Sequence, residues 1–436
     1  MQSDRFAQGT RQPSRISFAA LLVSLSLFAG CASRPVNSPL THFAPGEGYQ
    51  YQTRVGQMKD PATLVILAFS GGGTRAAAFS YGVLEMLRRT EAVGSKGNRF
   101  RLIDAVDIIT GVSGGSFTAL AYGLYGERLF DEYEKRFLKH NVQGELISGY
   151  LNPTNWAALS SAGWGRSELA AKLYDEILFE GATFADLQRR PGPLIAVTAT
   201  DLSTGTRVLF NQNFFNVICS DLGPVSLSRA AAASSAVPVV LSPITINNYG
   251  GTCGYAMPAW ARLFTDPATA PRPAARTVRR LIEIQTYDDS AHRPYLHLVD
   301  GGVSDNLGLR VVLDFIEGFE ASHMFGGQDQ VPEDSGQNVV EVVCDSPGQM
   351  PDRFHLLRLP DLLLQASALD FGRHAHGDIP RDGDRVGGAT VAHGNRPNLD
   401  EESLAVPAAG RHIELTRLAC ERPPDERVQC VDVLAG

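Results

Sequence analysis

The feature that most constrains the fold is a pattern that occurs twice: an apolar run, a glycine-rich turn and a segment with helical periodicity. The first run, Thr63–Phe69 (TLVILAF), is followed by Ser-Gly-Gly-Gly, and the second, at 105–110, is followed by Gly-Val-Ser-Gly-Gly. Continuous apolar runs of this length are typical of strands that are buried on both faces of a parallel sheet. Because strands and helices alternate, the sequence predicts an α/β fold.

Both turns lead into predicted helices. In residues 75–89 the apolar side chains are spaced by three and four residues, which places them on one face of a helix. Residues 116–125 are also predicted to be helical. The sequence also predicts strands at 194–200, 206–210, 281–285, 297–299 and 339–343, and helices at 309–319 and 360–371.

The N-terminus carries a signature of export. Three arginines precede an apolar run at 16–30, which is shorter than the roughly 20 residues that span a bilayer. The run leads into Leu-Phe-Ala-Gly-Cys, which resembles a bacterial lipobox, in which the cysteine, here Cys31, receives diacylglycerol. The resemblance implies an exported lipoprotein that Cys31 holds in the outer membrane, facing the periplasm. Anchoring in the inner membrane and secretion are the alternatives.

The charge of the chain argues against nucleic acid as a partner. The formal net charge at pH 7 is −8, and the sequence has no basic stripe with interleaved aromatic residues. Removing residues 1–30 deletes three cations and one acid, which changes the net charge to −10. Such a chain is not drawn to anionic lipid by its charge. The sequence identifies no protein partner.

The cysteines that follow Cys31 do not form a metal-binding pattern. They include no CxxC pair and no histidine at the spacing of a zinc site, so neither a metal nor another cofactor is expected. Two disulfides and one free thiol fit export to an oxidising compartment, with Cys420 and Cys430 as the first pair to test, and five buried thiols are the alternative. The five are Cys219, Cys253, Cys344, Cys420 and Cys430.

The motif with the clearest chemical meaning is Gly111-x-Ser113-x-Gly115. It lies directly after a predicted strand and before a predicted helix, which is the context of a nucleophile elbow. The tight turn exposes the Ser113 hydroxyl, and a glycine two residues to either side lets neighbouring chain pass without Cβ clashes. Ser113 is therefore the candidate nucleophile.

A second glycine-rich turn, Ser-Gly-Gly-Gly-Thr-Arg at 70–75, ends the preceding strand. In a parallel sheet this turn shares the carboxyl edge with Ser113. Its backbone N–H groups can bind a phosphate or the oxyanion of an acyl-transfer intermediate. The candidate donors are Gly71, Gly72, Gly73 and Thr74. Arg75 is expected to steady the loop, to meet a lipid phosphate or to form a structural salt bridge.

The same glycines also fit G-x-G-x-x-A, the fingerprint of a dinucleotide site. That fingerprint expects an acidic residue at the end of the second strand to bind ribose. The second run ends in Thr-Gly-Val-Ser instead. The sequence therefore favours an acyl-transfer site over a nucleotide site.

An acidic residue, Asp300, follows a third apolar run and precedes Gly301 and Gly302. The two glycines allow close approach of other chain segments, so Asp300 is the candidate base. Asp305, five residues later, is more plausibly a helix cap.

In this order, SGGGTR, GVSGG and DGG resemble the motifs of the patatin-like phospholipase family. Residues 199–202 (ATDL) and 233–238 (ASSAVP) are also similar to family segments, so the resemblance covers about 64–315. It implies a three-layer α/β/α fold with a mostly parallel central sheet, no metal, and hydrolysis of acyl esters of lipids. By position it implies a dyad of Ser113 and Asp300 without histidine and a glycine-loop oxyanion hole. The supporting positions are Arg75, Gly111, Gly115, Gly301 and Gly302.

This interpretation divides the chain into four parts. They are a signal peptide at 1–30, a tether or N-terminal arm at 31–60, a patatin-like catalytic domain at 61–320 and a C-terminal extension packed on it at 321–436. Two segments of the catalytic domain are too long to be simple connections. Residues 128–190 are predicted to form a helical cap, and 211–289 a loop-rich insertion around the cleft.

Two other functions remain open. Nine histidines follow Ser113, so a general carboxylesterase or thioesterase with a Ser-His-Asp triad is one alternative. A lipid-tethered binding protein without activity is the other, because a fold does not establish catalysis. A carboxylate with an ordinary pKa of about 3.9 is a weak base, so the dyad requires a site that raises this pKa.

Overall fold

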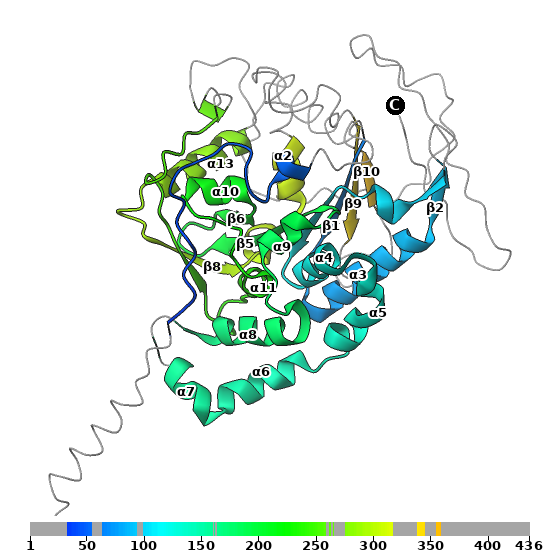
Figure 1. The fold of residues 1–436 in the computed structure, drawn as a ribbon, viewed down its shortest axis with the longest axis horizontal. Helices are drawn as coiled ribbons and strands as arrows, with labels where there is room; N and C mark the ends of the chain where they lie inside the picture. The colour runs from blue at the N-terminus through cyan, green and yellow to red at the C-terminus, as the bar shows by residue number, and fades with distance from the viewer. Residues whose placement is uncertain are drawn as a thin grey trace, which may run out of the picture.

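The computed structural model describes residues 33–54, 63–93, 99–159, 161, 164–258, 261–262, 265, 275–316, 338–344 and 355–358. Their centre is a mixed sheet of eight strands with helices around it (Figure 1). The strand order is β10-β9-β1-β4-β5-β8-β7, and β6 also pairs with β5. The bounds are β1 Thr63–Phe69, β4 Ile108–Val112, β5 Leu194–Asp201, β6 Arg207–Phe210, β7 Ile244–Asn247, β8 Tyr295–Asp300, β9 Asn338–Cys344 and β10 His355–Arg358.

The core of the sheet is parallel. Strands β9, β1, β4 and β5 run in the same direction. Strands β10, β6 and β8 pair with this core in the antiparallel direction, and β7 pairs antiparallel with β8 at the edge of the sheet. Strand β5 is buried along its whole length, which explains why its sequence, LIAVTATD, shows no alternation of apolar and charged residues. The predicted fold class is confirmed.

Helices cover both faces of the sheet. A Cβ atom on Gly111 would lie 2.8 Å from the Cα of Ser116 in α4 (Gly114–Tyr125), so this side of β4 faces α4. The preceding residue, Thr110, points the other way, and its hydroxyl lies 2.9 Å from where a Cβ on Gly308 would be. Gly308 directly precedes the helical residues 309–316. Helix α3 (Gly73–Arg89) packs beside α4, and together the layers form an α/β/α arrangement.

The segment at 128–190 is mostly helical. Its α-helices are α5 Leu129–Tyr133, α6 Val142–Leu151, α7 Pro153–Leu159, α8 Arg166–Tyr174 and α9 Phe184–Arg189. The described part of 211–289 contributes further helices and a strand of the main sheet, β7. The helices are α10 Gln212–Val217, α11 Leu227–Ser234 and α13 Ala275–Gln285.

One predicted strand, at 281–285, is in fact the end of α13. Leu281 is buried and Ile284 packs against the core, whereas Ile282 is half exposed. The prediction was wrong because a five-residue window with alternating apolar residues fits both a strand and a helix, and the spacing of three between Leu281 and Ile284 decides for the helix.

The residues at 33–54 lie along the body of the molecule and end in a short helix, α2 (Tyr51–Arg54) (Figure 1). Tyr49 is fully buried, and its hydroxyl accepts a hydrogen bond of 2.7 Å from the N–H of Ile195 in β5. Arg54 donates to the carbonyl of Arg190, at 2.7 Å, and to that of Leu187. This segment is therefore part of the packed structure.

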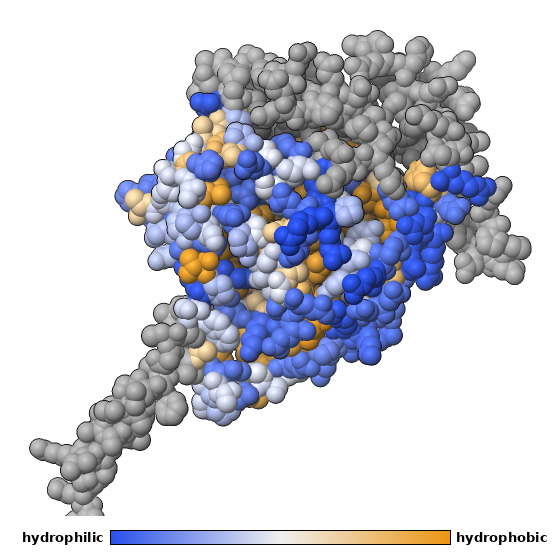
Figure 2. All heavy atoms as spheres, viewed as in Figure 1, coloured by the Kyte–Doolittle hydropathy of each residue, from blue (hydrophilic) through white to orange (hydrophobic). Residues whose placement is uncertain are grey.

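A disulfide joins Cys219 to Cys253. The carbonyls of these two cysteines accept hydrogen bonds from Leu40 and Phe43, so the disulfide also supports the N-terminal segment. The suggested pair of Cys420 and Cys430 lies outside the described residues. Among the residues that the structure describes, no helix is both long and apolar enough to cross a bilayer. In the view of Figure 2, hydrophilic residues dominate the described surface over α3 and α5.

Candidate active site

Ser113 occupies a sharp turn between β4 and α4. Its backbone lies in an unusual region, with φ of 48° and ψ of −118°, as a nucleophile elbow requires. The flanking glycines are sterically necessary: a Cβ on Gly111 would lie 2.8 Å from the Cα of Ser116, and a Cβ on Gly115 would lie 2.6 Å from the carbonyl oxygen of Phe69. The predicted supporting role of both glycines has this physical basis.

The structure brings Ser113 and Asp300 into direct contact. The Ser113 hydroxyl donates a hydrogen bond of 2.8 Å to the Asp300 carboxylate. The other carboxylate oxygen accepts the N–H of Gly302 at 2.7 Å. Both residues are almost buried, with 7% of Ser113 and 8% of Asp300 exposed, so the pair is largely shielded from solvent.

Strand register explains how residues so distant in sequence meet. Val112, the last residue of β4, pairs with Thr198 of β5, and the next residue of β5, Ala199, pairs with Asp300 of β8. Ser113 and Asp300 therefore lie at the same level on either side of β5. Close packing at Gly301 completes this approach, because a Cβ there would lie 2.5 Å from the carbonyl oxygen of Thr198.

Burial changes the acidity of the candidate base. Desolvation raises the pKa of the Asp300 carboxyl above its ordinary value, and the hydrogen bonds from Ser113 and Gly302 offset only part of this effect. A carboxylate with a raised pKa is a stronger base than one in water. This is the direction of shift that the sequence argument requires of a dyad without histidine.

The glycine loop lies against the nucleophile elbow. A Cβ on Gly114 would lie 2.0 Å from the carbonyl oxygen of Gly73, so the two backbones are in direct contact. Gly72 and Gly73 have φ angles of 142° and 66°, which favour glycine. Because α3 begins at Gly73, the N–H groups at this end have no acceptor within the helix.

The three loop glycines differ in their availability as donors. The N–H of Gly71 donates to the carbonyl of Asn306 at 2.8 Å, so it is already used. A Cβ on Gly71 would also lie 2.2 Å from the side-chain oxygen of Asn306. Gly72, Gly73 and Thr74 are exposed. These three residues are the better candidates for an oxyanion hole, and Gly71 has a structural role beside them.

A feature that the sequence analysis missed is how α11 holds the site. The Ser234 hydroxyl accepts a hydrogen bond of 2.8 Å from the N–H of Ser113. The backbone carbonyl of Ser234 accepts one of 2.9 Å from the N–H of Gly301. Two residues later, the carbonyl of Ala236 accepts the N–H of Asp300 at 2.9 Å. The sequence of the ASSAVP segment at 233–238 gives no direct signal of these contacts.

The remaining candidates lie as follows. Arg75 is exposed and makes no ion pair with any residue that the structure describes. Asp305 accepts the N–H of Arg310 at 2.9 Å and so caps the helical residues 309–316, as predicted. Cys31 lies outside the described residues.

No histidine side chain that the structure describes contacts Ser113 or Asp300. His140 pairs with Glu145, His292 with Asp289, and His297 with Thr245. Within the described ranges there is also no cluster of three or more His, Cys, Asp or Glu side chains that is arranged to hold a metal ion.

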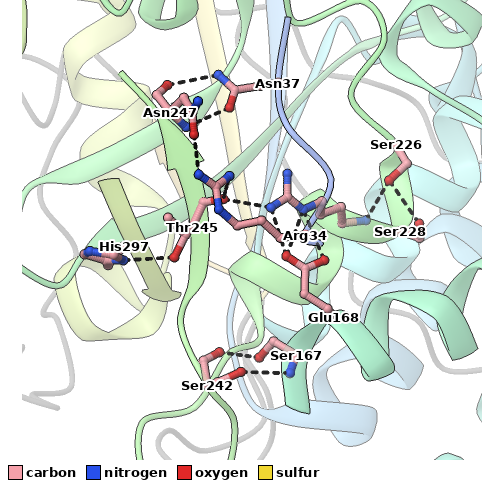
Figure 3. A network of polar contacts seen from close by, with 11 residues as sticks. Arg34, Asn37, Ser167, Glu168, Ser226, Ser228, Ser242, Thr245, Asn247 and His297 are labelled. Atoms are coloured by element: carbon pink, nitrogen blue, oxygen red, sulfur yellow. Dashed lines mark hydrogen bonds and ion pairs between the residues drawn. The ribbon is translucent and has the colours of Figure 1, made fainter. Parts of the chain in front are cut away.

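A network of polar contacts holds α11 against α8 and β7 (Figure 3). Arg229 of α11 forms a buried ion pair of 2.9 Å with Glu168 of α8. Arg229 also donates to the carbonyl of Thr245 in β7 at 2.7 Å. Arg34 donates to the same carbonyl at 3.1 Å and to the side chain of Asn247. The N-terminal segment, β7, α8 and α11 are thus joined.

Comparison with known proteins supports the motif analysis. The family model described as patatin-like phospholipase matches residues 67–313, more than half of the chain. A cGAMP-activated phospholipase of Escherichia coli is 29% identical over 190 residues, which cover 42% of this chain and 49% of that protein. The protein of the same name from Vibrio cholerae is 28% identical over 191 residues, with 41% and 49% covered. This chain therefore spans about half the length of the curated relatives that it matches.

Solved structures give a weaker comparison. Human GIVD cytosolic phospholipase A2 is 12% identical over 72% of this chain and 58% of its own, with a TM-score of 0.29. A score this low supports no argument about fold or activity.

Proposed function

Because the chain belongs to the patatin-like phospholipase family, we propose that it is a serine acyl hydrolase that cleaves acyl esters of lipids, phospholipids included, with Ser113 as nucleophile and Asp300 as base. One observation carries the proposal: the Ser113 hydroxyl donates directly to the Asp300 carboxylate at 2.8 Å. The glycine loop lies in contact with the same turn, so nucleophile, base and N–H donors converge.

In the first half of the reaction, the Ser113 oxygen attacks the ester carbonyl while its proton passes to Asp300. The carbonyl oxygen becomes an oxyanion, and the N–H groups of Gly72, Gly73 and Thr74 stabilise it. One good donor of this kind contributes about 2.7–4 kcal/mol to transition-state stabilisation. Collapse of the intermediate breaks the ester bond, and the proton on Asp300 goes to the leaving alkoxide. The acyl group stays on Ser113.

In the second half, Asp300 accepts a proton from water and the resulting hydroxide attacks the acyl-serine ester. A second oxyanion forms in the same place, and its collapse releases the fatty acid and returns the proton to the Ser113 oxygen. The proposal needs no histidine and no metal. Burial of Asp300 supports it, because desolvation gives this carboxyl a raised pKa.

Arg75 supports phospholipid as the substrate class. It follows the donors of the glycine loop directly, is exposed and has no ion-pair partner among the described residues. A free guanidinium in this position suits a phosphodiester next to the scissile ester.

We also propose that Cys31 is lipidated and that the protein is an exported lipoprotein, most simply of the outer membrane. The disulfide between Cys219 and Cys253 is consistent with an oxidising compartment. Mass spectrometry of the purified protein tests this directly. A mature N-terminus at Cys31 with diacylglycerol and acyl groups is expected, and an unmodified Cys31 would refute the proposal.

The decisive experiment for the activity is the release of fatty acid from a panel of phospholipids and short acyl esters. Wild-type mature chain is compared with Ser113→Ala, Asp300→Asn and, as a control, Asp289→Asn at an exposed aspartate that pairs with His292. We expect the first two variants to lose activity by at least about a thousandfold while remaining folded. If Asp300→Asn retains most of the rate, a triad with histidine is the correct mechanism. If wild type releases nothing from any ester, a binding protein is the better interpretation.

A further inference from the structure

Val239 is in an unfavourable position by two independent criteria. Its φ angle is 75°, a region that β-branched residues rarely adopt. Its side chain is also 89% exposed, so it gains nothing from the core in return. Strain of this kind is typical of functional surfaces.

Val239 is not alone. Val237, Val240 and Val303 are 46%, 61% and 60% exposed. We call these four residues the valine rim. They lie on two segments that adjoin the candidate base: Asp300 donates its N–H to the carbonyl of Ala236, next to Val237, and Val303 lies three residues after Asp300.

The segment that carries three of these valines is held in a defined shape. The N–H of Leu241 donates to the carbonyl of Val237 at 2.9 Å, and Arg166 donates to the carbonyl of Val239 at 3.0 Å. Ser242 is bonded to Ser167 at the start of α8 (Figure 3). The structure thus presents the valines to solvent next to the site.

We propose that the valine rim docks on a lipid bilayer and brings the segments beside Ser113 and Asp300 to the membrane surface. This inference rests on the proposed function, since a lipid acyl hydrolase must reach acyl chains that are packed in a bilayer. Four exposed aliphatic side chains on segments that adjoin the candidate base suit insertion among acyl chains, and exposed apolar patches mark such surfaces.

Chain connectivity favours a bilayer as the partner of the valine rim. The net charge of −10 without residues 1–30 gives no general attraction to anionic lipid, so apolar contact must supply the affinity. Arg34 is fixed to Thr245 of β7, and β7 begins four residues after Val240. Arg34 comes three residues after Cys31, and three residues of chain span at most roughly 11 Å. A lipid anchor on Cys31 would therefore keep this side of the molecule close to the membrane.

The test measures vesicle binding without turnover and without the anchor. The whole mature chain with Cys31→Ser and Ser113→Ala is mixed with phosphatidylcholine vesicles, and the bound fraction is measured by sedimentation. The same chain with Val239→Ser and Val240→Ser is compared with a control that carries Ile282→Ser and Met86→Ser, two aliphatic residues with 50% and 41% exposure on α13 and α3.

We expect the two valine substitutions to lower the partition coefficient by at least about tenfold, because burial of one valine changes a partition constant by roughly that factor. The control should change it by less than about twofold. Equal binding by the valine variant and its parent overturns the proposal. A second result would also overturn it: the valine variant binds vesicles as its parent does but has a different oligomeric mass, measured by light scattering without vesicles. A second copy of the chain would then be what covers the valine rim.

This experiment is separate from the test of activity. Vesicle binding of a Ser113→Ala protein does not depend on hydrolysis, so it can fail while soluble esters are still cleaved by the wild type. It can also succeed when no ester is cleaved, in which case the docking surface stands and the proposed function does not.

Discussion

The hydroxyl oxygen of Ser234 accepts a hydrogen bond of 2.8 Å from the backbone N–H of Ser113. The carbonyl of the same residue accepts the N–H of Gly301, next to Asp300. One residue at the end of α11 therefore fixes the turn that holds the candidate nucleophile and the turn that holds the candidate base. Since Ser234 forms no hydrogen bond with the Ser113 hydroxyl or the Asp300 carboxylate, its contribution is to position them.

We predict that Ser234→Ala lowers kcat by roughly 10- to 100-fold with KM changed by less than about twofold, because small displacements of reacting groups are costly. Ser234→Thr keeps the hydroxyl and should restore part of kcat. The matched control is Ser235→Ala, whose hydroxyl donates to the carbonyl of Ala231 and not to the site. Steady-state kinetics on a soluble ester gives both constants. A Ser234→Ala enzyme with normal kcat would show that the hydrogen bond has no positioning role.

The pH dependence of activity should report on Asp300. Desolvation raises the pKa of this carboxyl, and the base must be ionised to accept the Ser113 proton. The acid limb of kcat/KM against pH should therefore have its midpoint above the ordinary aspartate value of about 3.9. Ser234→Ala should leave this midpoint near its wild-type value. A midpoint at or below about 3.9 would argue against Asp300 as the base.

The same shift predicts a trade-off between stability and activity. The folded protein binds a proton at Asp300 more tightly than the unfolded chain does, so this contribution to stability is complete at low pH and is lost as pH rises through the folded-state pKa. At pH 7 the buried negative charge lowers the free energy of unfolding, and Asp300→Asn removes this charge. We expect Asp300→Asn to be at least as stable as wild type in urea unfolding at pH 7, with a smaller difference at pH 4. A clear loss of stability at pH 7 would contradict this account.

Much of the fold could be predicted because the signals are local. An apolar run, a glycine turn and a helical period specify β1, α3, β4 and α4, and the same glycines mark the residues that must approach closely. Ser113 and Asp300 were identifiable because each stands at a strand end beside glycines. Strand β7 is not predicted, since an alternating pattern of only four residues inside a long segment gives little signal.

The role of Ser234 could not be predicted for a different reason. Its partner, Ser113, lies 121 positions earlier, and the two meet only because β5, β8 and α11 pack together. A serine at the end of an alanine-rich helix has no local feature that distinguishes it from a serine on the surface. The same holds for Gly71, whose N–H is used by Asn306 and is therefore unavailable to an oxyanion.

The disulfide between Cys219 and Cys253 should be important for stability. It closes a loop with a sequence separation of 34. The backbone carbonyls of its two cysteines accept hydrogen bonds from the N-terminal segment. The chain-entropy relation gives about 3.8 kcal/mol for a loop of this length. We expect replacement of both cysteines by serine to lower the free energy of unfolding by roughly 3–4 kcal/mol, measured in urea. A loss below about 1 kcal/mol would show that the loop is held by its other contacts.

The buried ion pair between Glu168 and Arg229 should couple the fold to the site. Both side chains are only 6% exposed, and Arg229 lies on α11, the helix that ends at Ser234. Glu168→Gln leaves the guanidinium buried without its counter-charge, which costs about 3–5 kcal/mol when a buried pair is broken. Replacing both partners, Glu168→Met with Arg229→Met, should cost less, because no isolated charge remains.

Unfolding in urea separates these outcomes, and kcat of the folded fraction shows whether a displaced α11 also displaces Ser113. We expect Glu168→Gln to lower both stability and kcat. The control is the exposed pair of Lys172, on α8, and Glu176, in which Glu176→Gln should change stability by less than about 1 kcal/mol. If Glu168→Gln destabilises the protein but the folded fraction keeps its full kcat, the ion pair stabilises the fold without positioning the nucleophile.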